Sequence, residues 1–134
     1  MLSDEEKRML SKVRLEHAED CLVEAESLLS IEQYRGASNR AYYTVFHAIR
    51  AVLALDGIDR KSHSGAISEF RRLYIKTGIF DAAWSDMIGD QFDFRTANDY
   101  NDFFTPTREE TVEQVANAKR FLALITDYLK NVWS

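Results

Sequence analysis

Cysteine, proline and glycine are all scarce in this chain. One of its 134 residues is cysteine, one is proline and five are glycine. The lone thiol, Cys21, excludes a disulfide within one chain and a zinc site made of several cysteines, and its apolar neighbours indicate a small core residue. Because proline and glycine interrupt helices, their scarcity favours long helices over a fold rich in turns.

Long apolar runs and an excess of positive charge are missing too. No run approaches the roughly 20 residues that span a bilayer, and the segment 1–6 is acidic, unlike a signal peptide. Together with the lone thiol, these features predict a cytoplasmic protein. The net charge of −5 argues against nonspecific binding along duplex nucleic acid, but it leaves room for a small phosphate site.

The hydrophobic residues that are present recur with helical spacing. They make up 46% of the chain, enough for the core of one domain covering residues 1–134. Ser3 with Glu6 and Thr107 with Glu110 match the capping boxes that begin helices. The pattern predicts an all-α antiparallel bundle of five helices, over residues 3–30, 34–56, 64–76, 81–96 and 107–131. The polar segment 97–102 interrupts the spacing, so we expect a loop there.

The second predicted helix carries one narrow polar stripe on an otherwise apolar surface. At about 100° per residue, Arg40, Tyr43, His47 and Arg50 fall within an arc of roughly 80°. One interpretation is structural: the stripe hydrogen-bonds to glutamates of the first helix, at positions 16, 19, 24 or 26. The other is functional: Arg40 holds a phosphate and His47 acts as donor or general acid.

A second polar group lies in the segment where the fourth helix is expected to end. Asp99 and Asp102 suit either a turn, because aspartate caps local backbone groups there, or a metal ion, although two carboxylates alone do not make a metal site. Arg95 and Tyr100 need another explanation, since a turn requires neither. These four residues are therefore candidates for a ligand site.

A third group is the only dense basic region. It consists of Arg60, Lys61 and His63 in a predicted connection and of Arg71, Arg72 and Lys76 on the next predicted helix. Such a region attracts phosphate or an acidic partner, or it is simply a solvated surface.

Motifs for metals and common cofactors are missing from the sequence. The three histidines lie on different elements, and no HExxH, phosphate-binding loop or serine-hydrolase motif occurs. We expect neither a metal nor a cofactor.

Three segments together resemble the HEPN domain family, in particular its stand-alone UPF0332 branch. They are Arg40-Ala41-Tyr42-Tyr43 with Phe46-His47-Ala48, then Lys61-Ser62-His63-Ser64-Gly65, then Arg95 with Ala97-Asn98-Asp99-Tyr100. The resemblance implies an up-and-down bundle of four long helices with an additional short one, often as a homodimer. It also implies a prokaryotic protein paired with a small nucleotidyltransferase in a toxin–antitoxin or defence setting.

Many members of that family are metal-independent ribonucleases with an arginine, four to six further residues and a histidine near the last long helix. In this chain no histidine follows Arg95 at that spacing, and the segment offers Tyr100 instead. Arg40 and His47 have the spacing but lie on the second helix.

Three functions remain open. The leading one is a protein that binds RNA or nucleotide phosphate through Arg95 and Arg40, with Asp99, Tyr100, Asp102, Lys61 and His63 around the site. The second is a ribonuclease that uses His47 with Arg40 or Arg95. The third is a non-catalytic dimerisation module, which would expose aromatic residues at positions 84, 103, 104 or 133.

Overall fold

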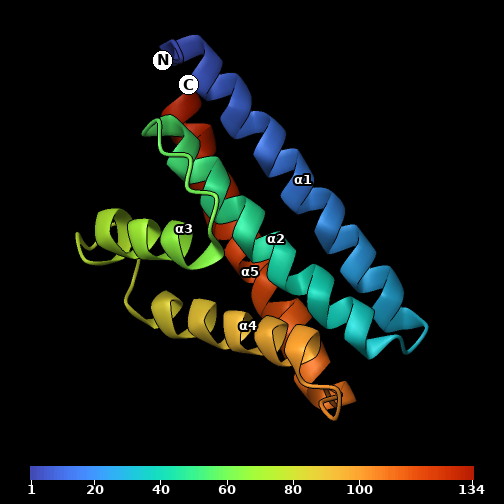
Figure 1. Ribbon diagram of the computed structural model, residues 1–134. Helices are drawn as coiled ribbons and strands as arrows, with labels where there is room; N and C mark the ends of the chain where they lie inside the picture. Colours follow the sequence, from blue (N-terminus) through green and yellow to red (C-terminus); the bar gives the residue numbers. More distant parts are fainter.

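The computed structural model describes all 134 residues and contains five α-helices and no strand (Figure 1). The prediction of an all-α fold with four long helices and one short helix is confirmed. A single π-helical turn, η1, continues the short helix. The elements are α1 Asp4–Ser30, α2 Tyr34–Leu55, α3 His63–Phe70, η1 Arg71–Ile75, α4 Ala83–Tyr100 and α5 Arg108–Trp133.

Both predicted capping boxes are present. The backbone N–H of Glu6 donates to Oγ of Ser3 at 3.1 Å, and the Glu6 carboxylate accepts from the Ser3 N–H at 2.9 Å. Thr107 and Glu110 make the same two bonds at the start of α5. Because these boxes satisfy N–H groups that have no partner within the helix, they fix where α1 and α5 begin.

The helices α1, α2 and α5 lie alongside one another, and α3 and α4 lie on one side of the pair α2–α5 (Figure 1). Both termini lie at the same end of the molecule. Helix α2 is the centre of the core, because its apolar residues meet neighbours on several sides. Fully buried residues of this core are Tyr42, Val45, Ile49, Val52 and Leu53 of α2 with Phe70, Ile88, Phe121, Ile125 and Leu129. None of the helices is both long and apolar enough to cross a membrane.

The fourth helix is longer than predicted. It runs through Tyr100, so the expected loop over residues 97–102 is wrong for its first four residues. The reason is that polar side chains which favour turns here make an ion pair and a hydrogen bond that are compatible with the helix. Asp99 pairs with Arg95 one turn earlier at 3.0 Å, and Asn98 donates to the backbone oxygen of Arg35 at 3.3 Å.

The third predicted helix is regular only as far as Phe70. The π-helical turn that follows contains Tyr74, which is buried and donates from its hydroxyl to Asp56 at 2.6 Å. Arg71, in the same turn, donates to the backbone oxygen of Ser85 at 3.0 Å. The prediction of one helix over residues 64–76 therefore missed this local widening.

Candidate functional site

Arg40 lies on the side of α2 that faces α1. Its guanidinium donates twice to Oδ1 of Asn39, at 2.7 and 3.1 Å, and approaches Glu24 of α1 at 3.8 Å. It also lies over the ring of Tyr43, 4.9 Å from the centroid. Of the four glutamates considered, Glu24 is thus an ion-pair partner. One third of the Arg40 side chain stays exposed, so the cation remains accessible.

His47 has no carboxylate partner on α1. Its ring meets His17 edge to face with centroids 5.7 Å apart, and its Nδ1 is enclosed without a hydrogen-bond partner. Burial lowers the pKa of His47 to about 4, and the charges of His17, Arg50 and Arg40 act in the same direction. His47 is therefore neutral at physiological pH.

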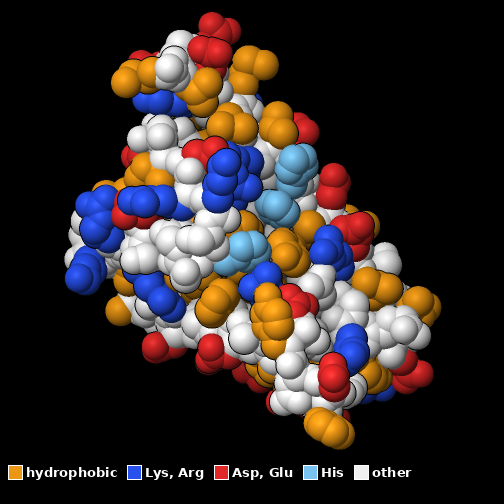
Figure 2. Space-filling view, viewed as in Figure 1, with side chains coloured by type: hydrophobic (Ala, Val, Ile, Leu, Met, Phe, Trp, Pro, Cys, Tyr) orange, Lys and Arg blue, Asp and Glu red, His pale blue; other side chains and the backbone are white.

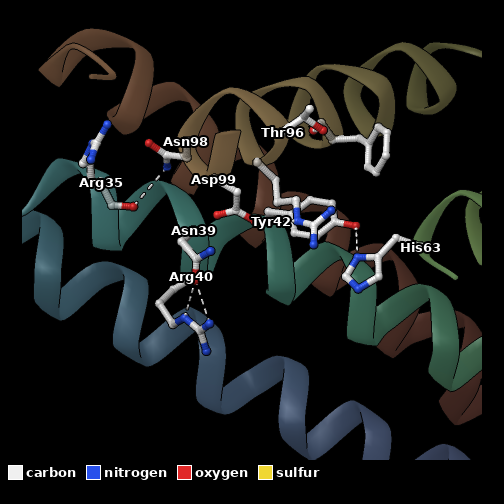
Figure 3. A network of polar contacts seen from close by, with 10 residues as sticks. Arg35, Asn39, Arg40, Tyr42, His63, Thr96, Asn98 and Asp99 are labelled. Atoms are coloured by element: carbon white, nitrogen blue, oxygen red, sulfur yellow. Dashed lines mark hydrogen bonds and ion pairs between the residues drawn. The ribbon is translucent and has the colours of Figure 1, made fainter. Parts of the chain in front are cut away.

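On the other side of α2, Tyr42 binds His63, the first residue of α3. The hydroxyl oxygen of Tyr42 lies 2.6 Å from Nδ1 of His63 (Figure 3). The ring of His63 stacks on Phe46, with centroids 4.1 Å apart and planes 4° from parallel. Burial raises the pKa of Tyr42, so its hydroxyl stays protonated at neutral pH.

Arg95 reaches this pair from α4. Its guanidinium lies 5.9 Å from the centroid of the Tyr42 ring, and its Nε is 3.0 Å from Asp99. Burial lowers the pKa of His63, and the charges of Arg95 and Arg50 lower it further. Arg95 is thus close enough to influence the groups on α2 and α3 electrostatically.

Aromatic rings connect the two sides into one site. Tyr43 lies 5.9 Å from His47 and 5.7 Å from His63, between ring centroids, and Phe46 contacts both histidines. Figure 2 shows histidine and basic side chains gathered on one face of the molecule. We call this surface the histidine–arginine face, formed by His17, His47, His63, Arg40, Arg50 and Arg95 around Tyr42, Tyr43 and Phe46.

Several predicted site residues lie outside this face. Tyr100 and Asp102 are exposed near the end of α4, and Tyr100 is five residues after Arg95, which turns it roughly 140° away around the helix. Lys61 is exposed and makes no hydrogen bond or ion pair. In the basic region, Glu69 pairs with Arg60 and Arg72, so part of that charge is balanced.

Two contributors were not identified as site residues from the sequence. His17 lies on the apolar stripe of the first predicted helix, and Tyr42 belongs to the segment that resembles the HEPN family; the structure gives each a histidine neighbour. The sequence signal for His17 is its helical spacing with apolar residues, and that for Tyr42 is its place in the family segment. Among the aromatic residues expected to mark an interaction module, Phe103 is fully exposed, whereas those at 84, 104 and 133 are partly buried.

The arrangement favours recognition of anions. Three guanidinium groups lie against a cluster of rings, and each has a carboxylate nearby: Glu24 for Arg40, Asp59 for Arg50 at 2.8 Å, and Asp99 for Arg95. Guanidinium groups bind phosphate through several parallel hydrogen bonds, so a phosphate here would compete with these carboxylates. Tyr43 of this cluster is partly exposed, and aromatic side chains in nucleic-acid sites stack on nucleobases. No group of three side chains with suitable ligand atoms lies close enough together to hold a metal ion.

Comparison with known proteins identifies the family. The model of the HEPN domain matches residues 11–128, which include the whole histidine–arginine face. A UPF0332 protein of Thermotoga maritima is 28% identical over 127 residues, which cover 95% of this chain and 96% of that protein. Putative toxin MJ0142 of Methanocaldococcus jannaschii is 32% identical over 128 residues, which cover 94% of this chain and 86% of that protein. Since the family model and these full-length matches agree, the chain belongs to the HEPN domain family.

Proposed function

We propose that this chain is the toxin-like component of a two-protein system in the prokaryotic cytoplasm and that its partner is a small nucleotidyltransferase. In this proposal the chain binds the phosphate of RNA or of a nucleotide. The observation that carries the binding proposal is the gathering of Arg40, Arg50 and Arg95 around one ring cluster, in a chain whose net charge is −5. The name of the relative from Methanocaldococcus jannaschii, putative toxin MJ0142, supports the toxin-like role.

Arg95 is the central residue of the proposed binding site. Its side chain is 19% exposed, so it is held by the Tyr42 ring and by Asp99 but still reaches solvent. Packing against the Tyr42 ring has already cost this guanidinium much of its conformational freedom, which lowers the cost of binding a phosphate.

RNA binding tests the proposal directly. The affinity of a labelled single-stranded RNA should fall about tenfold in Arg95→Gln, because a charge-assisted hydrogen bond is lost. Arg72→Gln is the matched control, since Arg72 is exposed and pairs only with Glu69. An equal loss of RNA affinity in both variants would mean that binding depends only on nonspecific electrostatic attraction, and the proposed site would be wrong.

Tyr100 is the proposed acceptor of a nucleotidyl group from the partner enzyme. The residue is 75% exposed, which makes the hydroxyl accessible to a second protein. In the reaction, the Tyr100 oxygen forms a bond to the α-phosphorus of ATP, pyrophosphate leaves, and the phenolic proton passes to solvent. Intact-mass analysis after incubation with the partner and ATP should show one added nucleotidyl group. An unchanged mass, or a modification that survives Tyr100→Phe, would contradict this role.

A homodimer is part of the same proposal. Leu2, Met9 and Val13 are exposed on or beside the first half of α1 and, with Leu10, line a shallow apolar groove. Light scattering should give the mass of a dimer for the native chain and that of a monomer for Met9→Lys. A monomeric native protein at high concentration would contradict the dimer.

A metal-independent ribonuclease is the second candidate. It is favoured by the contacts of His47 with Tyr43 and Phe46, the rings that connect it to the Arg95 side of the cluster. Cleavage of RNA in EDTA by the native protein, and its loss in a folded His47→Ala variant, would support this activity. Equal cleavage by both proteins would exclude His47 from it.

A further inference from the structure

The hydroxyl of Tyr42 has one acceptor within the protein. It lies 2.6 Å from Nδ1 of His63 and makes no other hydrogen bond, while Tyr42 as a whole is 1% exposed. A buried hydroxyl donates where an acceptor exists, and burial keeps the Tyr42 proton on oxygen at neutral pH. Nδ1 of His63 must therefore accept, which leaves the proton of the neutral ring on Nε2.

The opposite edge of the His63 ring is open. Nε2 has no hydrogen-bond partner in the protein, and it is not among the enclosed polar atoms that lack one. Stacking on Phe46 fixes the plane of the ring, and Tyr42 lies nearly parallel to it, at 11°. A single N–H donor is therefore presented to solvent in a fixed direction.

The groups around His63 suit a negatively charged acceptor. Arg95 and Arg50 both act on the ring electrostatically, and Asp99 is the opposing charge. His63 is also the first residue of α3, so it lies at the positive end of that helix dipole. A neutral imidazole N–H beside arginines can bind an anion without adding a further buried charge.

We propose that Tyr42 holds His63 in the tautomer with its proton on Nε2, and that this N–H donates to a phosphate oxygen whose charge Arg95 balances. The ligand class is a phosphate monoester or diester, as in a nucleotide or RNA. The inference rests on the proposed binding function and names a recognition group within it. Tyr42 is a positioning residue, since it acts through His63.

Nuclear magnetic resonance of the histidine rings tests the tautomer. In the ¹⁵N-labelled protein at neutral pH, long-range ¹H–¹⁵N spectra should show an unprotonated Nδ1 and a protonated Nε2 for His63. AMP and inorganic phosphate should both shift the Nε2 signal, and adenosine should not. A proton on Nδ1, a response to adenosine equal to that of AMP, or bound AMP without any His63 response would overturn the inference.

Variants distinguish the role of Tyr42 in orienting the His63 ring from the hydrogen bond that His63 donates to the phosphate. His63→Phe keeps the stacking but has no N–H, so AMP affinity should fall about tenfold, and His63→Gln should restore part of it. Tyr42→Phe should release the hydrogen bond at Nδ1, populate the second tautomer and weaken AMP binding about two- to fivefold. The matched control is Tyr74→Phe, which also loses a buried phenol hydrogen bond, to Asp56, and should leave AMP affinity unchanged.

The experiment also distinguishes this inference from the proposed function. If the native protein binds neither RNA, AMP nor phosphate, the proposed function fails and this inference fails with it. If Arg95→Gln weakens binding while His63→Phe and Tyr42→Phe do not, the proposed function stands and the role of His63 is wrong.

Discussion

The imidazole rings of His17 and His47 meet edge to face across the α1–α2 interface, with centroids 5.7 Å apart. Nδ1 of His47 is enclosed and unpartnered, and burial lowers the pKa of the ring to about 4. The charges of Arg50, Arg40 and Arg14 add to that effect. Protonation of His47 is thus disfavoured in the folded state compared with the unfolded chain.

We expect this difference to make the protein less stable in acid. Between pH 6.5 and about pH 4 the unfolded chain protonates His47 while the folded protein does not, so the free energy of unfolding falls as pH falls. Above pH 6.5 His47 is neutral in both states, and titration of His47 takes nothing from the free energy of unfolding. Below about pH 4 His47 is protonated in both states, and the loss of unfolding free energy is complete. Allowing for partial exposure of the ring, the loss is on the order of 2 kcal/mol. Urea unfolding at a series of pH values measures it.

His47→Gln is the comparison for this pH dependence, because glutamine does not titrate. The difference in unfolding free energy between the native protein and the variant should change across this pH window. His17→Gln should give an intermediate slope, since one of the charges acting on His47 is removed. Parallel curves for the native protein and His47→Gln would show that the pKa of His47 is not lowered.

Arg14 should be important for stability although it lies outside the histidine–arginine face. It is 7% exposed, and it donates to the backbone oxygen of Arg50 at 3.1 Å and to Asp59 at 3.0 Å. These bonds tie α1 to α2 and to the segment after α2. Arg14→Ala should lower the free energy of unfolding by about 2 kcal/mol, through lost hydrogen bonds and lost packing. Chemical denaturation measures the change.

The control for Arg14 is Arg72→Ala, which also removes an arginine from an ion pair. Arg72 is exposed, and its pair with Glu69 lies at the surface, where water screens the charges. Its unfolding midpoint should match that of the native protein. A similar loss in both variants would mean that burial of Arg14 adds nothing to the stability.

The helices could be predicted from the sequence because their signals are local. Apolar spacing and the capping pairs Ser3–Glu6 and Thr107–Glu110 lie within a few residues of each helix start, and both boxes form. The end of α4 was misjudged because the acceptor for Asn98 is the backbone of Arg35, 63 residues away. A side chain that favours a turn was thus used in a contact that no local pattern reveals.

The site was predictable in part for the same reason. The polar stripe with Arg40 and His47 follows from spacing along one helix, and the structure keeps it on one face. The bond between Tyr42 and His63 joins residues 21 apart on two helices, and it depends on how the chain turns between them. Contact of Arg95 with the Tyr42 ring depends on how α4 packs against α2, which periodicity does not specify.

A buried amide network should couple three helices energetically. Ser38 of α2 donates to Oε1 of Gln114 at 2.6 Å, Gln114 donates to Oε1 of Gln91 at 3.0 Å, and Gln91 donates back to the Gln114 backbone oxygen at 2.9 Å. Gln91→Ala and Gln114→Ala should each cost about 2 kcal/mol, since each leaves a buried polar partner unsatisfied. The double variant should cost less than the sum, with a coupling of about 1 kcal/mol in urea unfolding. Additive losses would show that the two amides act independently.

Asp99 should oppose ligand binding, because its carboxylate already pairs with the Arg95 guanidinium that a phosphate would bind. The two side chains form an ion pair at 3.0 Å, and 35% of the Asp99 side chain is exposed. Asp99→Asn removes the competing negative charge and keeps a side chain of the same size. The affinity for AMP should therefore rise about two- to threefold, as expected when a weak, partly exposed ion pair is released. Calorimetric titration at low salt measures this change.

Asp86→Asn is the matched control for Asp99, because it makes the same change of charge on the same helix, at an exposed position nine residues before Arg95. A general loss of negative charge would raise affinity equally in both variants, whereas a direct effect on Arg95 would appear only in Asp99→Asn. Salt separates the two further: raising the ionic strength should weaken AMP binding in every variant and still leave Asp99→Asn the tightest. Weaker binding in Asp99→Asn would mean that Asp99 positions Arg95 for the phosphate rather than competing with it.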